Sequence, residues 1–488
     1  MERVKTGIDA LDETIQGGLV KGDSTLIMGG PGTGKTTLGL QFIFNGATMF
    51  GDGGLYLTFE EMPDRLYRDA LNFGWDLKAL EEKDKARVIC TSPDLLFKGG
   101  IGAVLDEPIK EVNAKRAVVD TLSHLRLFLP ESKVRIEAYR LINYLKKKGL
   151  TSLLLCETRS EEKGYDVERE FSFLADGVIQ LQLRRERGNV FPTITVVKMR
   201  GIDFPRQSNT FEIRDRGITV YAKPRLTMAK ETSRAKVRTG IPGLDKVLEG
   251  GLPGGSSTIV SGPTGTGKTV IGLQFLIEGA KLGEPGVFIS YEEPESQLRR
   301  IISGLNWDIS GYEKKRLLKL DSLYPEDLTP EAHLLRIMRH IEEMKAKRLV
   351  FDSVSAMEHM MERDNFLDFS KRLTSILKNS QVTAILNNTS RSIGGMTITE
   401  TMLSTLADNI IMLRFVEIES SMRKALIIVK VRGSDFDKHI TEYAIASKGL
   451  EVIGPLEEYE GILTGTPKKT PSERFVDTIL KRAREGRE

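Results

Sequence analysis

Two phosphate-binding loops occur in this single chain of 488 residues. Each follows the pattern G-x-x-x-x-G-K-[ST] and lies between an apolar run and a helix-like run. Backbone N–H groups in such a loop wrap a phosphate chain, the lysine reaches the outer phosphates, and the next hydroxyl binds Mg²⁺. Two loops in the same setting argue against a chance match. The residues expected to contact a nucleotide are Gly29, Gly30, Pro31, Gly32, Thr33, Gly34, Lys35, Thr36, Thr37, Gly262, Pro263, Thr264, Gly265, Thr266, Gly267, Lys268, Thr269 and Val270.

The chain repeats itself around these loops. Lys35 and Lys268 lie 233 positions apart (268 − 35), whereas Asp120 and Asp352 lie 232 apart (352 − 120). One residue is therefore missing from the second copy, and we expect the loss in the turn around Gly51–Gly54. A period of this length indicates a tandem duplication of a whole domain and excludes a solenoid of short repeats.

Strand-like and helix-like runs alternate within each copy. This pattern predicts two α/β domains, each a mostly parallel sheet covered by helices on both faces. A chain of 488 residues is also too long for one ordinary core. We expect domains at residues 1–221 and 237–465, joined by a polar linker at 222–236 and followed by a charged tail at 466–488.

The chain is balanced in charge, with 71 basic and 68 acidic residues and a formal net charge of +3. This balance gives little support for binding nucleic acid or an anionic membrane. No signal-peptide core or membrane-length apolar stretch is apparent, so we expect a cytoplasmic protein with no membrane partner. Cys90 and Cys156 lie in strand-like runs and are expected to be buried free thiols. His333 and His340 could share a helix face, but the histidines form no zinc pattern.

A carboxylate ends one apolar run in each copy. Asp120 ends Ala-Val-Val-Asp, and Asp352 ends Leu-Val-Phe-Asp. A carboxylate in this place can hold Mg²⁺, directly or through water, beside the loop hydroxyls of Thr36 and Thr269. The alternative is a capping aspartate, because many buried strands end in one. The phosphate loop upstream in each copy favours the metal role.

An acidic pair follows the next strand in each copy, as Glu60–Glu61 and Glu292–Glu293. In a wound sheet this position is the carboxyl edge, where nucleotides bind. One carboxylate can orient or deprotonate an attacking water or hydroxyl, and two adjacent like charges raise the proton affinity of one of them. The alternative is a solvated acidic pair at the start of a helix. Recurrence in both copies favours a catalytic role, and which glutamate is the base stays open.

A basic pair ends a late strand-like run in each copy, as Lys198 with Arg200 and Lys430 with Arg432. Alternation along a strand points both side chains of a pair to the same face. Such a pair is suited to phosphate oxygens, and a solvated strand edge is an equally good interpretation.

Together these residues resemble the KaiC family of RecA-like ATPases, over roughly Val4 to Pro467. The resemblance rests on the doubled phosphate loops, glutamate pairs and Lys-x-Arg-Gly strands. It implies two tandem RecA-like P-loop domains in a double-ringed homohexamer, with nucleotide bound between neighbouring subunits. It also implies that the first glutamate pair serves ATP hydrolysis and that the Lys-x-Arg pair reaches a neighbour's nucleotide, as an arginine finger does.

The second copy resembles the family further in the segment 398–408. The clock proteins of the family phosphorylate an adjacent serine and threonine in this place, and here those positions are Ser404 and Thr405. Thr399 matches an auxiliary hydroxyl, beside Glu400. The first copy has Ser172–Phe173 at the equivalent pair, so its missing hydroxyl suits hydrolysis alone. The alternative is that these hydroxyls are merely structural.

The leading hypothesis is a hexamer that hydrolyses ATP with Mg²⁺, phosphorylates itself and serves timing or signalling. A RecA-type DNA-binding motor is the alternative, which the near-neutral charge and few aromatics argue against. A nucleotide-filled scaffold with little turnover is a third possibility. For the hexameric ATPase and for the scaffold, we expect an unknown regulatory protein at the C-terminal tail.

Overall fold

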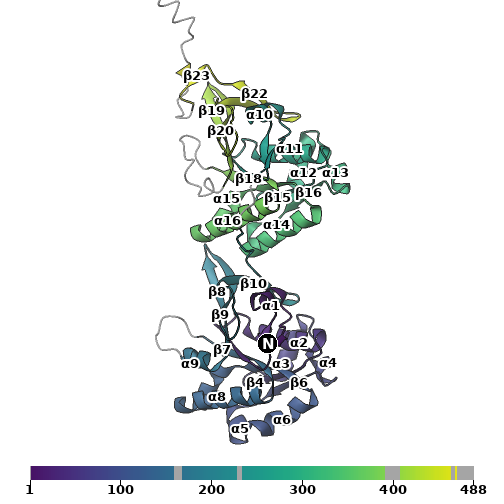
Figure 1. Cartoon of the computed structure of the whole chain (residues 1–488), viewed down its shortest axis with the longest axis vertical. Helices are drawn as coiled ribbons and strands as arrows, with labels where there is room; N and C mark the ends of the chain where they lie inside the picture. Colours follow the sequence, from purple (N-terminus) through teal and green to yellow (C-terminus); the bar gives the residue numbers. More distant parts are fainter. Residues whose placement is uncertain (1, 159–166, 228–232, 391–406, 463–467, 470–488) are drawn as a thin grey trace, which may run out of the picture. The chain divides into compact units, whose positions relative to one another are not determined.

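The computed structural model describes residues 2–158, 167–227, 233–390, 407–462 and 468–469. The chain divides into two units, Met1–Lys223 (unit 1) and Pro224–Glu488 (unit 2), drawn in Figure 1. The division falls inside the expected linker at 222–236. A strand of unit 2, β12 (Ser233–Val237), already begins within that linker.

Unit 1 is built on one sheet of nine strands. Their order is β11-β10-β9-β8-β3-β7-β6-β4-β5, with β3 in the middle. The six strands from β8 to β5 run parallel, and β9, β10 and β11 extend the sheet antiparallel. The strands of the unit are β1 (Arg3–Val4), β2 (Leu19–Val20), β3 (Ser24–Gly29), β4 (Gly53–Thr58), β5 (Ala86–Cys90), β6 (Ala114–Asp120), β7 (Thr151–Glu157), β8 (Gly177–Glu186), β9 (Asn189–Met199), β10 (Ser208–Arg214) and β11 (Gly217–Tyr221).

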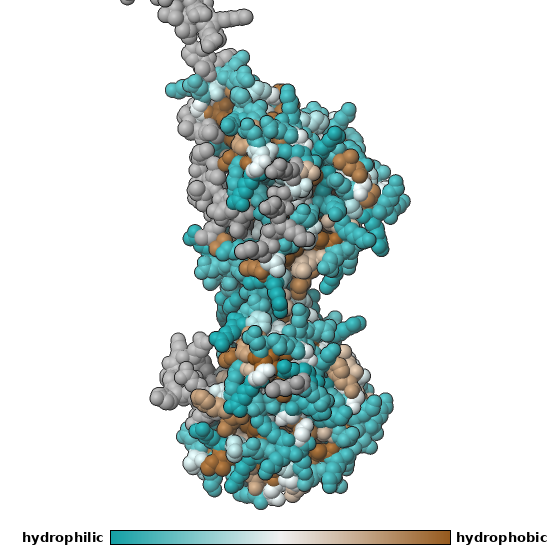
Figure 2. All heavy atoms as spheres, viewed as in Figure 1, coloured by the Kyte–Doolittle hydropathy of each residue, from teal (hydrophilic) through white to brown (hydrophobic). Residues whose placement is uncertain are grey.

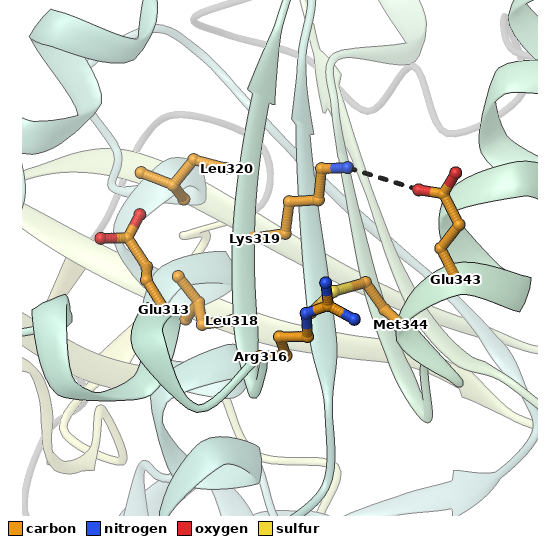
Figure 3. Close-up of a pocket in the computed structure, with 7 residues that line it drawn as sticks. All are labelled: Glu313, Arg316, Leu318, Lys319, Leu320, Glu343 and Met344. Carbon is orange, nitrogen blue, oxygen red and sulfur yellow. Dashed lines mark ion pairs between the residues drawn. The ribbon is translucent and has the colours of Figure 1, made fainter.

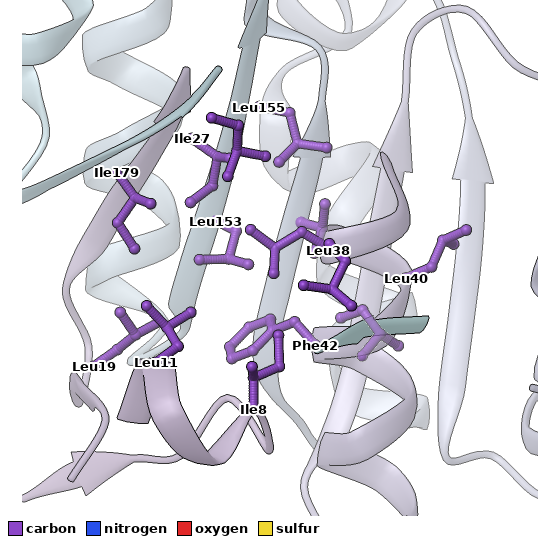
Figure 4. Close-up of a cluster of buried hydrophobic side chains, with 14 of the residues drawn as sticks. Ile8, Leu11, Leu19, Ile27, Leu38, Leu40, Phe42, Leu153, Leu155 and Ile179 are labelled. Atoms are coloured by element: carbon purple, nitrogen blue, oxygen red, sulfur yellow. The ribbon is translucent and has the colours of Figure 1, made fainter. Parts of the chain in front are cut away.

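Helices cover both faces of this sheet. Leu153 and Leu155 of β7 pack on one face, in the cluster with Phe42 that Figure 4 shows. Leu154 and Cys156 point to the other face and pack in a second cluster. Because the sheet is covered on both faces, the middle of the parallel strands is largely apolar, as in Val118–Val119 of β6 and Leu153–Leu155 of β7. The helices are α1 (Asp9–Thr14), α2 (Lys35–Met49), α3 (Pro63–Leu71), α4 (Leu77–Glu81), α5 (Pro93–Lys98), α6 (Ile101–Glu111), α7 (Leu125–Phe128), α8 (Glu131–Lys147) and α9 (Val167–Leu174).

Unit 2 repeats this architecture strand for strand. Its sheet has the order β16-β15-β17-β18-β14-β19-β20-β21-β22, so the α/β fold and its duplication are confirmed. The further strands are β13 (Leu252–Gly254), β14 (Ser257–Gly262), β15 (Gly286–Ser290), β16 (Leu318–Ser322), β17 (Arg348–Asp352), β18 (Thr383–Thr389), β19 (Asn409–Ile418), β20 (Ser421–Val431), β21 (Thr441–Ala446) and β22 (Gly449–Pro455). The helices are α10 (Pro242–Val247), α11 (Lys268–Lys281), α12 (Glu295–Gly304), α13 (Ser310–Lys314), α14 (Pro330–Met344), α15 (Val354–Met360) and α16 (Arg363–Asn379).

Two details differ from the sequence-based expectations. Cys156 is buried as expected, but Cys90 is exposed, because it ends β5 at the edge of the sheet. The expected tail at 466–488 includes a short strand, β24 (Lys468–Lys469), which pairs with β23 (Tyr459–Glu460). The remainder of the tail, and with it the expected partner site, lies outside the described residues.

A buried arginine at the start of one strand was not foreseen. Arg116 is 1% exposed, pairs with Asp52 at 2.8 Å, and donates to the backbone oxygens of Lys5 and Phe42. It therefore ties the first strand of the chain to the helix that follows the phosphate loop. Arg348 of unit 2 repeats the arrangement with Glu284 at 2.7 Å.

These arginines also locate the lost residue. Each packs against a helical glycine, Gly46 or Gly279, and these lie 233 positions apart (279 − 46). Their carboxylate partners lie 232 apart (284 − 52). The loss therefore falls near the end of the helix, slightly before the turn at Gly51–Gly54, and α2 is indeed one residue longer than α11.

We predict that Arg116→Met lowers the free energy of unfolding of unit 1 by about 3 kcal/mol or more, because it leaves two backbone oxygens without their partner and Asp52 with only the exposed Lys115. Lys115→Met is the matched control. Lys115 also pairs with Asp52, at 3.3 Å, but its side chain is 53% exposed, so we expect less than about 1 kcal/mol. Equal losses in urea unfolding would contradict the assigned role of the buried arginine.

Candidate functional site

Each phosphate loop connects the central strand of its sheet to a helix. The loops lie between β3 and α2 in unit 1 and between β14 and α11 in unit 2. Gly34 and Gly267 precede these helices with φ of 91° and 98°, a left-handed conformation that favours glycine. A Cβ on Gly34 would also come within 2.7 Å of Ile213. The helix amino terminus behind each loop is a ready anion-binding site.

The loop lysines lie across the loops that carry them. Lys35 Nζ donates to the oxygens of Gly29 and Gly30 at 2.9 and 2.7 Å. Lys268 Nζ donates in the same way to Gly262, at 2.8 Å. Burial lowers the pKa of both lysines. Each ammonium group is thus held against the backbone of its loop, where it could bind an anionic group.

The structure joins each loop threonine to the strand-end aspartate. Thr36 Oγ1 donates to Asp120 Oδ2 at 3.0 Å, and Thr269 Oγ1 donates to Asp352 Oδ2 at 2.8 Å. Burial raises the pKa of both aspartates, while the threonine hydrogen bonds oppose that rise. A hydroxyl and a carboxylate at this spacing form a set of hard oxygen donors that suits Mg²⁺.

Sequence reasoning missed a second partner of Asp120. Tyr56 is buried in β4, and its hydroxyl donates to Asp120 Oδ2 at 2.7 Å. The equivalent residue of unit 2 is Phe288, at the 232 offset. A comparison of the two copies would have shown tyrosine at this position in unit 1 and phenylalanine in unit 2. No motif includes this residue.

Both glutamate pairs lie at the carboxyl edge of the sheet, just beyond β4 and β15. The Thr58 hydroxyl accepts hydrogen bonds from the backbone N–H groups of Glu60 and Glu61, at 3.2 and 3.0 Å. Ser290 does the same for Glu293, at 3.0 Å. A hydroxyl side chain at the end of the strand therefore fixes the backbone turn that places each glutamate pair at the sheet edge.

The two members of a pair have different surroundings. Glu60 is 63% exposed and lies 3.5 Å from His124 Nδ1. Glu292 is also exposed and accepts a hydrogen bond from Ser353, the residue after Asp352. Glu61 and Glu293 are half-buried, and burial raises the pKa of each, with a further rise from the nearby aspartate.

The unit 1 basic pair lies at the opposite end of the sheet from its own phosphate loop. Arg200 pairs with Asp176 at 3.5 Å, and Asp176 accepts a hydrogen bond from the backbone of Ser24, where β3 begins. Lys198 donates to the oxygens of Ser172 and Ala175, around the end of α9. The loop follows the other end of β3, roughly 16 Å away at the rise of a strand.

The second basic pair has the same placement. Lys430 donates to the oxygen of Ala407, and Arg432 lies 3.7 Å from Asp408. Asp408 in turn accepts from the backbone of Ser257, at the start of β14. The expected phosphorylation residues, Thr399, Ser404 and Thr405, lie outside the described residues.

The two histidines singled out in the sequence do lie on one helix, α14. His333 accepts from the Tyr291 hydroxyl at 3.1 Å and donates to the oxygen of Pro325 at 2.9 Å. His340 contacts Asp321 at 2.7 Å. Tyr291 directly precedes Glu292, so α14 supports the backbone from which the second glutamate pair projects.

Comparison with known proteins gives this geometry its context. The model of the KaiC ATPase family matches residues 4–225 and again residues 237–457. The chain belongs to the KaiC family. The resemblance seen in the sequence is thereby confirmed, and the chain carries two ATPase domains of the KaiC family, one in each unit.

Relatives align with the chain over nearly its whole length. The circadian clock oscillator protein KaiC of Picosynechococcus sp. is 34% identical over 96% of this chain and 93% of its own length. The protein of the same name from Parathermosynechococcus lividus is 32% identical over 99% and 92%. The circadian clock oscillator protein KaiC 1 of Synechocystis sp. is 33% identical over 96% and 92%. Among the described residues, no helix combines the length and apolar character that a membrane crossing requires.

We predict that His333 makes unit 2 less stable in acid. Burial lowers its pKa from 6.5 to about 4, so the unfolded chain binds a proton that the folded unit does not. The free energy of unfolding should therefore fall as the pH drops from 6.5 toward 4, by about 3 kcal/mol at most. The matched control is Tyr291→Phe with His333→Ile, the residues that unit 1 has at Phe59 and Ile101.

Trp307 fluorescence in a Trp75→Phe background reports on unit 2 alone, because the chain has two tryptophans. The control should lose this part of the pH dependence. The same slope in both proteins would show that another group is responsible.

Proposed function

We propose that this protein binds and hydrolyses Mg²⁺-ATP in both units, assembles as a ring of six copies, and phosphorylates itself in unit 2. The single observation that supports this best is the doubled cluster of loop threonine, strand-end aspartate and exposed glutamate at one sheet edge. Its relatives are named circadian clock oscillator proteins. We propose that this protein likewise serves timing or signalling, as a ring driven by ATP.

The nucleotide's phosphates occupy the loops in this proposal. The backbone N–H groups and the lysines Lys35 and Lys268 bind them. Thr36 with Asp120, and Thr269 with Asp352, hold Mg²⁺, which when bound neutralises charge on the outer phosphates. Burial raises the pKa of each aspartate, and the threonine hydrogen bond and the loop lysine oppose that rise.

The exposed glutamate of each pair acts as the base. Glu60 and Glu292 reach outward from the edge, whereas Glu61 and Glu293 are half-enclosed by their own unit. In unit 1 the base accepts the proton of an attacking water. In unit 2 it accepts the proton of the Ser404 or Thr405 hydroxyl, whose oxygen forms the new bond to the γ-phosphorus as the ADP oxygen leaves.

The basic pairs act on a neighbour's nucleotide. Because Arg200 lies at the far end of β3 from its own loop, it is better suited to a site in another copy. Large apolar side chains are also exposed on neighbouring helices of unit 1, at Leu127, Ile136, Tyr139 and Phe173, as an interface between copies requires. Figure 2 shows one face of the molecule, on which hydrophilic side chains predominate in both units.

Glu60→Gln should lower ATP hydrolysis by unit 1 about a hundredfold, because it removes the base but keeps its shape. Phosphate release is measured in a Lys268→Ala background, which removes nucleotide from unit 2. Glu61→Gln is the matched control, and we expect a smaller loss. Full activity in Glu60→Gln with none in Glu61→Gln would assign the base to the other glutamate, and full activity in the double variant would contradict catalysis by the pair.

Mixing two proteins that are each defective in unit 1 should restore hydrolysis by that unit, measured again in the Lys268→Ala background. Arg200→Ala removes the finger and should reduce turnover about a thousandfold, yet its Glu60 is intact. Glu60→Gln subunits supply an intact Arg200, so mixed rings contain some complete sites. Arg140→Ala, at a side chain equally exposed, is the control and should stay active alone. A monomer by light scattering in Mg²⁺-ATP would rule out the shared site.

Ser404 and Thr405 should gain phosphate during incubation with Mg²⁺-ATP, as measured by phosphopeptide mapping, with Thr399 as an auxiliary acceptor. Glu292→Gln should slow this about a hundredfold. Lys35→Ala, which removes nucleotide from unit 1, should leave nucleotide bound in unit 2, the unit that carries the acceptor hydroxyls. If nucleotide is bound in unit 2 and none of the three residues is modified, the protein is an ATPase without autokinase activity.

A further inference from the structure

The outer edge of β16 in unit 2 is open. Bonds from Gly286 N to Leu317 O and from Leu323 N to Ser290 O show which amides of β16 face β15. By alternation, the N–H groups of Leu318 and Leu320 face the other way. In the part of the chain that the structure describes, no strand pairs with this edge and the outward N–H of Leu320 has no partner.

A pocket of about 430 Å³ follows this edge (Figure 3). Leu318 and Leu320 belong to the apolar core on one face of the sheet, whereas Lys319 reaches toward Glu343 on α14, which packs on the other face. The open space therefore runs along the strand edge and is bordered from both faces. Its lining residues are Glu313, Arg316, Leu318, Lys319, Leu320, Glu343 and Met344.

Unit 1 closes the same edge with its own side chains. Arg87, the counterpart of Lys319, lies 3.0 Å from Glu111 and 3.4 Å from Asp84. Glu81 lies 3.6 Å from Arg87 and also accepts the outward N–H of Val88, at 3.3 Å. Arg87 thus crosses the strand edge, and the Glu81 carboxylate satisfies the outward N–H group of the strand. This is a usual protection of an edge strand against pairing with other chains.

Three substitutions undo this closure in unit 2. Lys319 stands in place of Arg87 and lies 3.8 Å from Glu343. Glu313, the counterpart of Glu81, is held instead by Arg299, at 2.7 Å, where unit 1 has Tyr67. Arg316 stands in place of Asp84, and its exposed guanidinium has no ion pair among the described residues.

We propose that this edge binds an extended, acidic segment of a partner protein, which adds to the sheet as a tenth strand beside β16. Its main chain hydrogen-bonds to the outward N–H and C=O groups of Leu318 and Leu320, which is the β-augmentation mode of peptide recognition. A carboxylate of the segment pairs with Arg316. The charges select an acidic partner, because Glu313 is paired with Arg299 and Glu343 with Lys319, whereas Arg316 has no ion pair among the described residues.

The test uses the full chain and a fluorescein-labelled hexapeptide of alternating valine and glutamate, followed by fluorescence anisotropy. The wild type should bind this peptide at least about tenfold more tightly than two variants of it. One has lysine in place of glutamate, and the other has N-methylated amides that cannot join a sheet. Equal binding of the N-methylated peptide would replace strand addition with a simple anion site, and no binding of the glutamate peptide would overturn the proposal.

Protein variants provide the second arm. Arg299→Tyr, Arg316→Asp and Lys319→Arg together give unit 2 the closed edge of unit 1, and binding should weaken about tenfold or more. Arg316→Lys keeps the charge and should bind like the wild type, whereas Arg316→Asp alone should weaken binding. Nucleotide binding by each variant in a Lys35→Ala background, which removes nucleotide from unit 1, confirms that unit 2 is folded. Unchanged peptide binding in the folded triple variant would overturn the proposal.

Discussion

A carboxylate enclosed at the end of an interior strand, β6 or β17, is the feature on which each site depends. Asp120 and Asp352 lie where water is scarce, so burial alone would favour their neutral forms. Each is bonded to the first hydroxyl of the phosphate-loop helix, Thr36 or Thr269. This one contact fixes the helix, the loop and the strand to one another. The lysines and the glutamate pairs then take their positions around it.

The helix of the phosphate loop is held at its other end by a different buried ion. Arg116 and Arg348 bind a carboxylate that follows the helix and the backbone of the strand that begins the unit. Removing an arginine of this kind from water is unfavourable unless its hydrogen bonds are complete. Around Arg116 they are supplied by two backbone oxygens as well as the carboxylate, so the helix of unit 1 is braced at both ends.

The two copies share this frame and differ in the residues around it. Tyr56 adds a hydrogen bond to Asp120, whereas unit 2 has Phe288. Glu157, beside the loop of unit 1, contributes to the charge around Lys35, whereas unit 2 has Thr389. At the sheet edge, Arg87 covers the outer strand of unit 1, whereas a pocket remains beside Lys319 in unit 2. A duplicated domain kept the contacts that build the loop and changed those that surround it.

The sequence alone determined the duplicated α/β architecture and the placement of each loop between a strand and a helix, because motif spacing and apolar runs are local properties of the chain. It also indicated the pairing of Thr36 with Asp120, since parallel strands bring their carboxyl ends to one edge. Only the tertiary structure decided that Arg200 lies at the far end of β3, that Glu61 is enclosed while Glu60 is exposed, and that Cys90 faces solvent. Burial, strand order and side-chain partners arise from residues distant in the chain, and no local pattern contains them.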